Sequence, residues 1–247
     1  MSYCVALKLD RGLIFMSDTL TNGGLDNISC YPKTFKWGVD GERQIFLSTA
    51  GNLATTQAVV STLSEQTKPS ATDDLSILKA PTMFQGARII SKTLSKVIGH
   101  SAEGQQGADS AFSATMILGG QIANDEMRLY LIYPEGNFIE VSASNPFFQI
   151  GETKYGRPIL VRAFDPAMSF SDAIKLLMVS FDSTIKANLS VGLPLDINIY
   201  HNDSLADAEV LRVSEDDPYY QMISSAWGEA LKASMAQLPE FTFKTSG

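Results

Sequence analysis

Short apolar runs and segments of helical periodicity follow one another along the whole chain. Apolar runs bounded by polar turns predict strands at residues 2–9, 13–18, 28–36, 44–48, 112–122, 127–133, 138–142, 195–200 and 208–213. Apolar residues spaced three and four apart predict helices at residues 52–66, 82–101, 155–164, 169–187 and 217–237. The helix at 169–187 begins with Ser169 and has Asp172 three residues later, a pattern typical of a capping box.

The first two strands carry apolar residues on both faces. In the first of them, Val5 and Leu7 alternate with Cys4 and Ala6. A strand of this kind is expected to be covered on both sides. Two central antiparallel sheets between two helical layers satisfy this requirement, so we predict an α+β fold, a four-layer αββα sandwich. No linker rich in Pro, Gly or Ser divides the chain, so residues 1–247 are expected to form a single domain.

Composition and charge exclude several classes of function. The net charge of −8 argues against a nucleic-acid or anionic-membrane partner, since phosphate binding depends on clustered Lys and Arg. The chain has neither a signal peptide nor an apolar run long enough for a membrane span, so we expect a cytoplasmic protein. Two cysteines, Cys4 and Cys30, are too few for a disulfide framework or a zinc site. The two histidines, His100 and His201, lie on separate elements, so we expect no metal, no cofactor and no Ser/His/Asp triad.

Ser2 is the candidate nucleophile. Its small side chain permits an aminopeptidase to remove Met1, which leaves a hydroxyl and a free α-amine on one residue. A tight turn within Asp10–Gly12 joins the first two strands and places residue 19, 20 or 21 opposite Ser2. Asp18 is then a near neighbour across the hairpin, although an aspartate also commonly does no more than end a strand.

Two further positions are candidates for the same site. Lys33, in the string CYPKTFKW, is a candidate catalytic cation, although its spacing alone favours a solvated strand lysine. Gly51, in the string TAGNLATTQ, follows a strand and precedes a helix that begins at Asn52. Such a junction leaves backbone N–H groups without intrahelical partners, and these groups suit a negatively charged oxygen.

Taken together, the second-residue nucleophile, the aspartate of SDTLTN, the lysine of PKTFKW and the glycine of TAGNLATTQ resemble the active-site series of proteasome β-type subunits. These belong to the N-terminal nucleophile hydrolases, which share the αββα sandwich. The longer strings are closer still to the Anbu family of ancestral bacterial proteasome-like β subunits. The strings that carry this resemblance are MSYCVALKLDRGLIFMSDTLTNGGLDNIS, FLSTAGNLATTQ, FFQIGETKYGRPIL, NLSVGLPLDINIY and DDPYYQMISSAWGEAL, from the first residue to about residue 231.

The resemblance implies a peptidase or amidohydrolase that acts on peptides or proteins. Ser2 Oγ would attack a carbonyl, its proton passing to its own α-amine or to Lys33, and water would hydrolyse the acyl ester. Asp18 would hold Lys33, and the Gly51 N–H would form part of the oxyanion hole. The resemblance also implies a homo-oligomer, an open ring or spiral, with the last helix, about 217–237, as a family-type extension.

Some positions depart from the proteasome pattern. Leu20 stands where an arginine usually supports the site, and the segment from Ala187 to Gly192 lacks the usual aspartate. Ser190 and Asn188 remain candidate supporting residues, and a Gly-Ser-Gly stretch is replaced by Gly151, Glu152 and Thr153. Two alternatives follow from these departures and from the chemistry of an acyl-serine: a largely non-catalytic self-assembling subunit, and an amide-forming acyl transferase.

Overall fold

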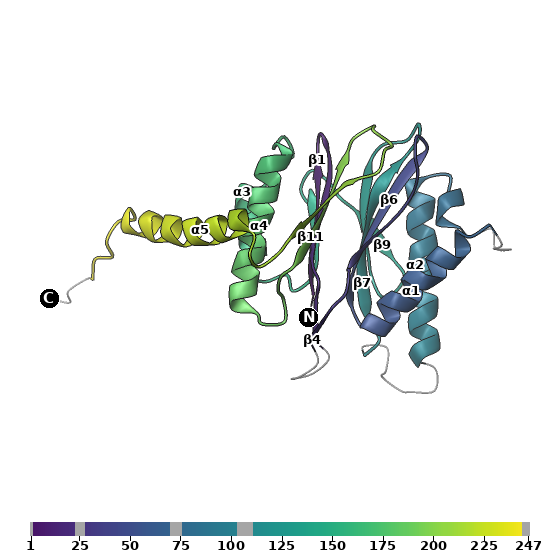
Figure 1. Ribbon diagram of the computed structural model, residues 1–247, viewed down its shortest axis with the longest axis horizontal. Coiled ribbons are helices and arrows are strands. Elements are labelled where there is room, and N and C mark those ends of the chain that lie inside the picture. The colour runs from purple at the N-terminus through teal and green to yellow at the C-terminus, as the bar shows by residue number, and fades with distance from the viewer. Residues whose placement is uncertain (1, 23–27, 70–75, 103–110, 244–247) are drawn as a thin grey trace.

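Two five-stranded antiparallel sheets pack face to face (Figure 1). The computed structural model describes residues 2–22, 28–69, 76–102 and 111–243. In the first sheet the strand order is β10 (Phe147–Gly151), β1 (Tyr3–Leu9), β2 (Gly12–Asp18), β11 (Leu195–His201) and β12 (Glu209–Val213). In the second sheet it is β5 (Thr34–Val39), β6 (Arg43–Gly51), β7 (Ala114–Ile122), β8 (Arg128–Ile132) and β9 (Phe138–Glu140). A separate short pair is formed by β3 (Leu20–Asn22) and β4 (Ile28–Cys30).

Helices cover the outer face of each sheet (Figure 1). The second sheet is covered by α1 (Leu53–Gln66) and α2 (Met83–Ala102), with a 3₁₀ turn η1 (Ile77–Lys79) between them in sequence. The first sheet is covered by α3 (Arg157–Ala163) and α4 (Phe170–Ala187). A last helix, α5 (Pro218–Ala236), starts beside α4 and extends away from the body (Figure 1). In the part of the chain that the structure describes, no helix has both the length and the apolar character needed to cross a membrane.

Three apolar clusters fill the spaces between the four layers. On β1, Val5 and Leu7 pack with α3 and α4, whereas Cys4 and Ala6 face the second sheet. The third cluster joins β6 and β7 to α1 and α2. Each large apolar side chain that becomes fully buried contributes about 1.5–3 kcal/mol. The αββα sandwich and the two-sided burial of the first strands are therefore confirmed.

The hairpin of β1 and β2 has the expected register. Cys4 lies opposite Ser17, and continuing this register by two residues places Thr19 opposite Ser2. This position falls within the predicted range. The predicted capping box at α4 is also confirmed, because the Asp172 N–H donates to Ser169 Oγ at 3.0 Å.

The strand predicted at 28–36 is wrong. The chain forms β4 and β5 there, with an interruption at residues 31–33. Pro32 lies in this interruption, and a proline has no N–H to donate to a sheet. Strands β3 and β10 occupy segments for which no strand was predicted. The interruption has a direct consequence for the site, because it leaves Lys33 outside the strand.

Candidate active site

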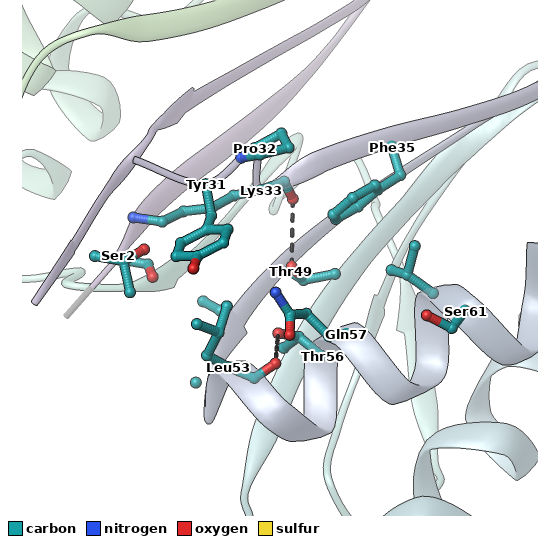
Figure 2. A pocket seen from close by; sticks show the side chains of 14 residues that line it. Ser2, Tyr31, Pro32, Lys33, Phe35, Thr49, Leu53, Thr56, Gln57 and Ser61 are labelled. Atoms are coloured by element: carbon teal, nitrogen blue, oxygen red, sulfur yellow. Dashed lines mark hydrogen bonds between the residues drawn. The ribbon is translucent and has the colours of Figure 1, made fainter. Parts of the chain in front are cut away.

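Four segments from both sheets converge at one end of the sandwich. Ser2 precedes β1, Asp18 ends β2, Lys33 precedes β5 and Gly51 ends β6. Ser2, Lys33 and Gly51 line the same cleft, whose volume is about 300 Å³ (Figure 2). Asp18 is fully buried behind it. The structure thus brings all four of these predicted residues to one place.

Two donors form hydrogen bonds to the same oxygen of the Asp18 carboxylate. The Tyr3 N–H donates to Asp18 Oδ1 at 2.8 Å, and Lys33 Nζ donates to the same oxygen at 2.7 Å. The other oxygen, Asp18 Oδ2, is buried and forms no hydrogen bond of normal geometry with the described residues. Burial raises the pKa of the Asp18 carboxyl, and the nearby Lys33 ammonium limits this rise.

Lys33 is fixed at both ends of its side chain. Its backbone carbonyl accepts a hydrogen bond from the Thr49 N–H on β6 at 2.8 Å. Its ammonium donates to Asp18 and, at 2.6 Å, to the carbonyl oxygen of Leu20. Leu20 therefore contributes its backbone to the site even though the usual arginine side chain is absent. An ammonium has three donors, so one remains for a group in the cleft.

Backbone contacts with the segment after β10 fix the position of Ser2. The Glu152 N–H donates to the Ser2 carbonyl oxygen at 2.7 Å. Gly151 has a φ of +83°, and a Cβ built on it would lie 1.9 Å from the Ser2 carbonyl oxygen. A side chain at this position would displace Ser2, so the close approach of the two backbones requires glycine.

The N–H of Gly51 faces the cleft. Along a strand, successive N–H groups point to opposite sides. Asn52 donates to Ser113 O on the β7 side at 3.0 Å, whereas Thr49 donates to Lys33 O on the other side. Gly51 lies one residue before Asn52 and two after Thr49, so its N–H points away from β7 and toward the Lys33 side. The geometry is that of a donor for an oxygen bound in the cleft.

The candidate supporting residues Asn188 and Ser190 lie close together after α4. Asn188 Oδ1 accepts a hydrogen bond from the Ser190 N–H at 2.9 Å, and Asn188 Nδ2 donates to Glu152 Oε2 at 2.9 Å. A carboxylate is thus present in this network, but Glu152 supplies it instead of an aspartate in the 187–192 segment. The departure at Gly151–Thr153 is visible in the sequence, but Glu152 was not among the predicted site residues.

Sequence analysis also missed most of the cleft wall. The additional lining residues come from the 31–35 segment, β6 and α1, and include Tyr31, Phe35, Thr49, Leu53, Gln57 and Val60 (Figure 2). They come from three separate segments of the chain, so no single local sequence pattern predicts them as a group. The mixture of aromatic, aliphatic and neutral polar side chains suits an uncharged group.

Cys4 does not compete with Ser2 as a nucleophile. Its side chain is completely buried, and its Sγ donates to Thr49 O at 3.5 Å. Burial raises the pKa of the Cys4 thiol far above its usual range, so the reactive thiolate is not formed near neutral pH. Among the described residues, no group of three or more His, Cys, Asp or Glu side chains is arranged to hold a metal ion.

Comparison with known proteins identifies close structural relatives. No protein-family model matches the sequence, and no curated protein matches it. Among solved structures, Anbu (ancestral beta-subunit) from Yersinia bercovieri is 41% identical with a TM-score of 0.89, covering 98% of this chain and 99% of its own. Anbu from Hyphomicrobium sp. strain MC1 is 42% identical with a TM-score of 0.89, covering 98% and 100%.

A third relative was solved as an assembly. The helical assembly of the Anbu complex from Pseudomonas aeruginosa is 40% identical with a TM-score of 0.90, covering 97% of this chain and 98% of that chain. Identity at this level over nearly the whole length, together with the shared sandwich, places this chain in the Anbu family.

Proposed function

We propose that this protein is an N-terminal nucleophile peptidase or amidohydrolase, with Ser2 as the nucleophile once Met1 has been removed. The observation that carries the proposal is the buried ion pair of Lys33 and Asp18, 2.7 Å apart, with the lysine lining the same cleft as Ser2. Buried charges are rarely retained unless they are paired or functional. The third donor of the Lys33 ammonium is free to stabilise the Ser2 oxygen.

In the proposed reaction, Ser2 Oγ attacks a peptide or amide carbonyl carbon while its proton passes to the Ser2 α-amine. An ordinary α-amine titrates near ~8 and an ordinary lysine near ~10.4, so the α-amine is the easier neutral base. Lys33 Nζ already donates to Asp18 and to Leu20 O, so we assign it the role of an electrostatic stabiliser instead of a base. The Gly51 N–H donates to the oxyanion that forms.

The tetrahedral intermediate then collapses. The C–N bond breaks, the α-ammonium returns its proton to the leaving amine, and an ester remains on Ser2 Oγ. Water attacks the ester with the α-amine again accepting a proton, which releases the acid and regenerates the Ser2 hydroxyl. An amine in place of water would give acyl transfer, and product analysis with added amines distinguishes this outcome.

Hydrolysis of a peptide library by protein of verified mass tests the proposal. Intact mass spectrometry first confirms that Met1 has been removed. We expect turnover by the wild type, no turnover by Ser2→Ala, and wild-type turnover by the control Ser144→Ala, which alters an exposed serine. Equal turnover by the wild type and Ser2→Ala would contradict the proposal. No turnover by the wild-type, Met1-free protein would favour the non-catalytic alternative.

The proposed function includes assembly with further copies of the same chain. Helix α5 extends from the body (Figure 1). Exposed apolar side chains lie along it and continue into the segment that follows it. These are Tyr219, Met222, Leu231, Met235, Leu238, Phe241 and Phe243. An exposed apolar surface of this kind marks an interaction site. The relative from Pseudomonas aeruginosa forms a helical assembly, so we infer that a second copy covers this surface.

Sedimentation velocity tests the role of α5 in assembly. Met235→Asp places a charge on the exposed end of the helix, where Met235 is 68% exposed. We expect smaller species for this variant and unchanged assemblies for the control Lys92→Asp, which places the same charge on the exposed face of α2. An unchanged sedimentation profile for Met235→Asp would contradict a role for α5.

A further inference from the structure

Glu152 is a buried carboxylate that no cationic side chain among the described residues pairs with. Its residue is only 5% exposed. Its Oε1 accepts the Lys154 N–H at 3.0 Å and its Oε2 accepts Asn188 Nδ2 at 2.9 Å. No Lys, Arg or His side chain in the described segments forms an ion pair with it. Burial of an uncompensated carboxylate is costly, which indicates that a positive partner is missing from this state of the chain.

Ser2 is the residue nearest to this carboxylate that gains a charge on maturation. The Glu152 N–H and the Ser2 carbonyl oxygen are already 2.7 Å apart, and Gly151 packs directly on the Ser2 backbone. The Ser2 nitrogen belongs to the same residue as that carbonyl, so the Glu152 backbone is anchored beside the residue that carries the new charge. While Met1 is attached, this nitrogen is a neutral amide. Removal of Met1 converts it into an ammonium and creates a cation beside Glu152.

We propose that Glu152 is a positioning residue whose carboxylate pairs with the α-ammonium of Ser2 in the Met1-free protein. The inference deepens the proposed function and rests on it, because it requires the mature N-terminus. Asn188 fixes the glutamate, since its own amide is anchored by the Ser190 N–H. The mature site then contains two buried carboxylates and two cations: Asp18 pairs with Lys33, and Glu152 pairs with the α-amine.

This pairing has a consequence for catalysis. An opposite charge within hydrogen-bond reach raises the pKa of an amine, and a rise of about 1 unit from ~8 still leaves the α-amine below an ordinary lysine near ~10.4. The α-ammonium that forms when Ser2 Oγ loses its proton is therefore stabilised, much as a buried aspartate stabilises the imidazolium of a serine protease triad. The carboxylate also fixes the direction of the amine toward the hydroxyl of the same residue.

Titration of the α-amine tests the pairing without relying on activity. The pKa of the α-amine at residue 2 is obtained from the pH dependence of its acetylation. Mass spectrometry measures this acetylation in the Ser2→Ala background after Met1 removal. We expect Glu152→Gln to lower the pKa of the α-amine by about 1 unit. The control Glu126→Gln, at an exposed loop position, is expected to leave it unchanged. An unchanged α-amine pKa in Glu152→Gln would overturn the inference.

A second variant keeps the inference testable if Glu152→Gln does not fold. Asn188→Ala leaves the carboxylate in place but removes the side chain that fixes its direction, so the α-amine pKa is expected to fall. A rise or no change would overturn the inference.

Kinetics of the otherwise wild-type chain give an independent readout. In Glu152→Gln the acid limb of the pH profile of kcat/KM is expected to move to lower pH. The maximum of the profile is expected to be lower than in the wild type. A lower maximum with no shift of the limb would show a merely structural role. Because the titration uses an inactive background, failure of the proposed hydrolysis and failure of this inference are separate results.

Discussion

Lys33 Nζ and Asp18 Oδ1 lie 2.7 Å apart across the junction between the two sheets of the sandwich. Asp18 ends β2 in the first sheet, and Lys33 immediately precedes β5 in the second. Their side chains are 0% and 6% exposed. The pair therefore joins the two halves of the core at the point where the cleft opens, and its loss affects both stability and chemistry.

Removal of one member of this pair is expected to destabilise the fold. In Lys33→Met the Asp18 carboxylate stays buried without its cation, which costs about 3–5 kcal/mol of unfolding free energy. Urea denaturation of the Met1-free protein measures this cost. The control Glu229→Gln breaks the exposed pair with Lys232 and is expected to change stability little.

The double variant Asp18→Asn with Lys33→Met separates stability from function. Removing both charges of a buried pair is often neutral for stability, so the unfolding free energy is expected to recover most of the loss. Activity is not expected to recover, because the cation beside Ser2 is gone. Recovery of turnover in the double variant would show that the pair has only a structural role.

The pH dependence of the site follows from the direction of the Asp18 shift. Burial raises the pKa of the Asp18 carboxyl above its ordinary value near ~3.9, so the ion pair is lost at a higher pH than for an exposed aspartate. The folded state binds this proton more tightly than the unfolded chain. Between the ordinary and the raised value, the Asp18 contribution to the unfolding free energy therefore increases as pH falls, while activity decreases.

The difference in unfolding free energy between the wild type and Asp18→Asn, measured from about pH 4 to pH 7, isolates this contribution. We expect the wild type to gain stability relative to the variant toward the acid end of this range. A difference that is constant with pH would contradict the assigned direction.

Gly51 is expected to tolerate no side chain. Its φ is +122°, and an added Cβ would lie 2.5 Å from the carbonyl oxygen of Ser113. Gly51→Ala must move the backbone whose N–H faces the cleft, so both thermal stability and reaction of Ser2 with a covalent probe are expected to fall. Gly41→Ala is the matched control, because Gly41 also has a positive φ, +76°, but has no atom within 4 Å of the added Cβ.

The control variant separates the cost of placing a side chain at a positive φ from the effect of moving the backbone at the cleft. Gly41→Ala is expected to cost only the conformational penalty, about 1–2 kcal/mol, and to leave probe reaction unchanged. If Gly51→Ala and Gly41→Ala reacted equally well with the probe, the Gly51 N–H would have no role in the cleft.

The part of the site that depends on local structure could be predicted from the sequence. A tight hairpin turn and a two-residue side-chain period bring Asp18 near Ser2, and the structure confirms this register. A strand followed by Gly51 and a helix start was also recognisable. Lys33 was identified from the family resemblance, but its predicted place on a strand was wrong because the effect of Pro32 was overlooked.

Contacts between distant segments could not be predicted in the same way. Strand β10 carries aromatic residues and pairs along the edge of β1, but a short apolar run gives little periodicity to distinguish a strand from a helix. Glu152 and Asn188 are 36 positions apart, and only the fold brings them together. Glu152, which stands where the proteasome pattern has a small residue, was visible in the sequence, but its partner Asn188 was not.

Mapping the adduct of a peptide β-lactone on Met1-free protein tests the central claim most directly. Tandem mass spectrometry of the N-terminal peptide locates the acyl group. The account predicts a single adduct on Ser2 Oγ in the wild type and none in Ser2→Ala. An adduct confined to another residue, such as the exposed Cys30, or no adduct on protein with a verified free Ser2 amine, would contradict it.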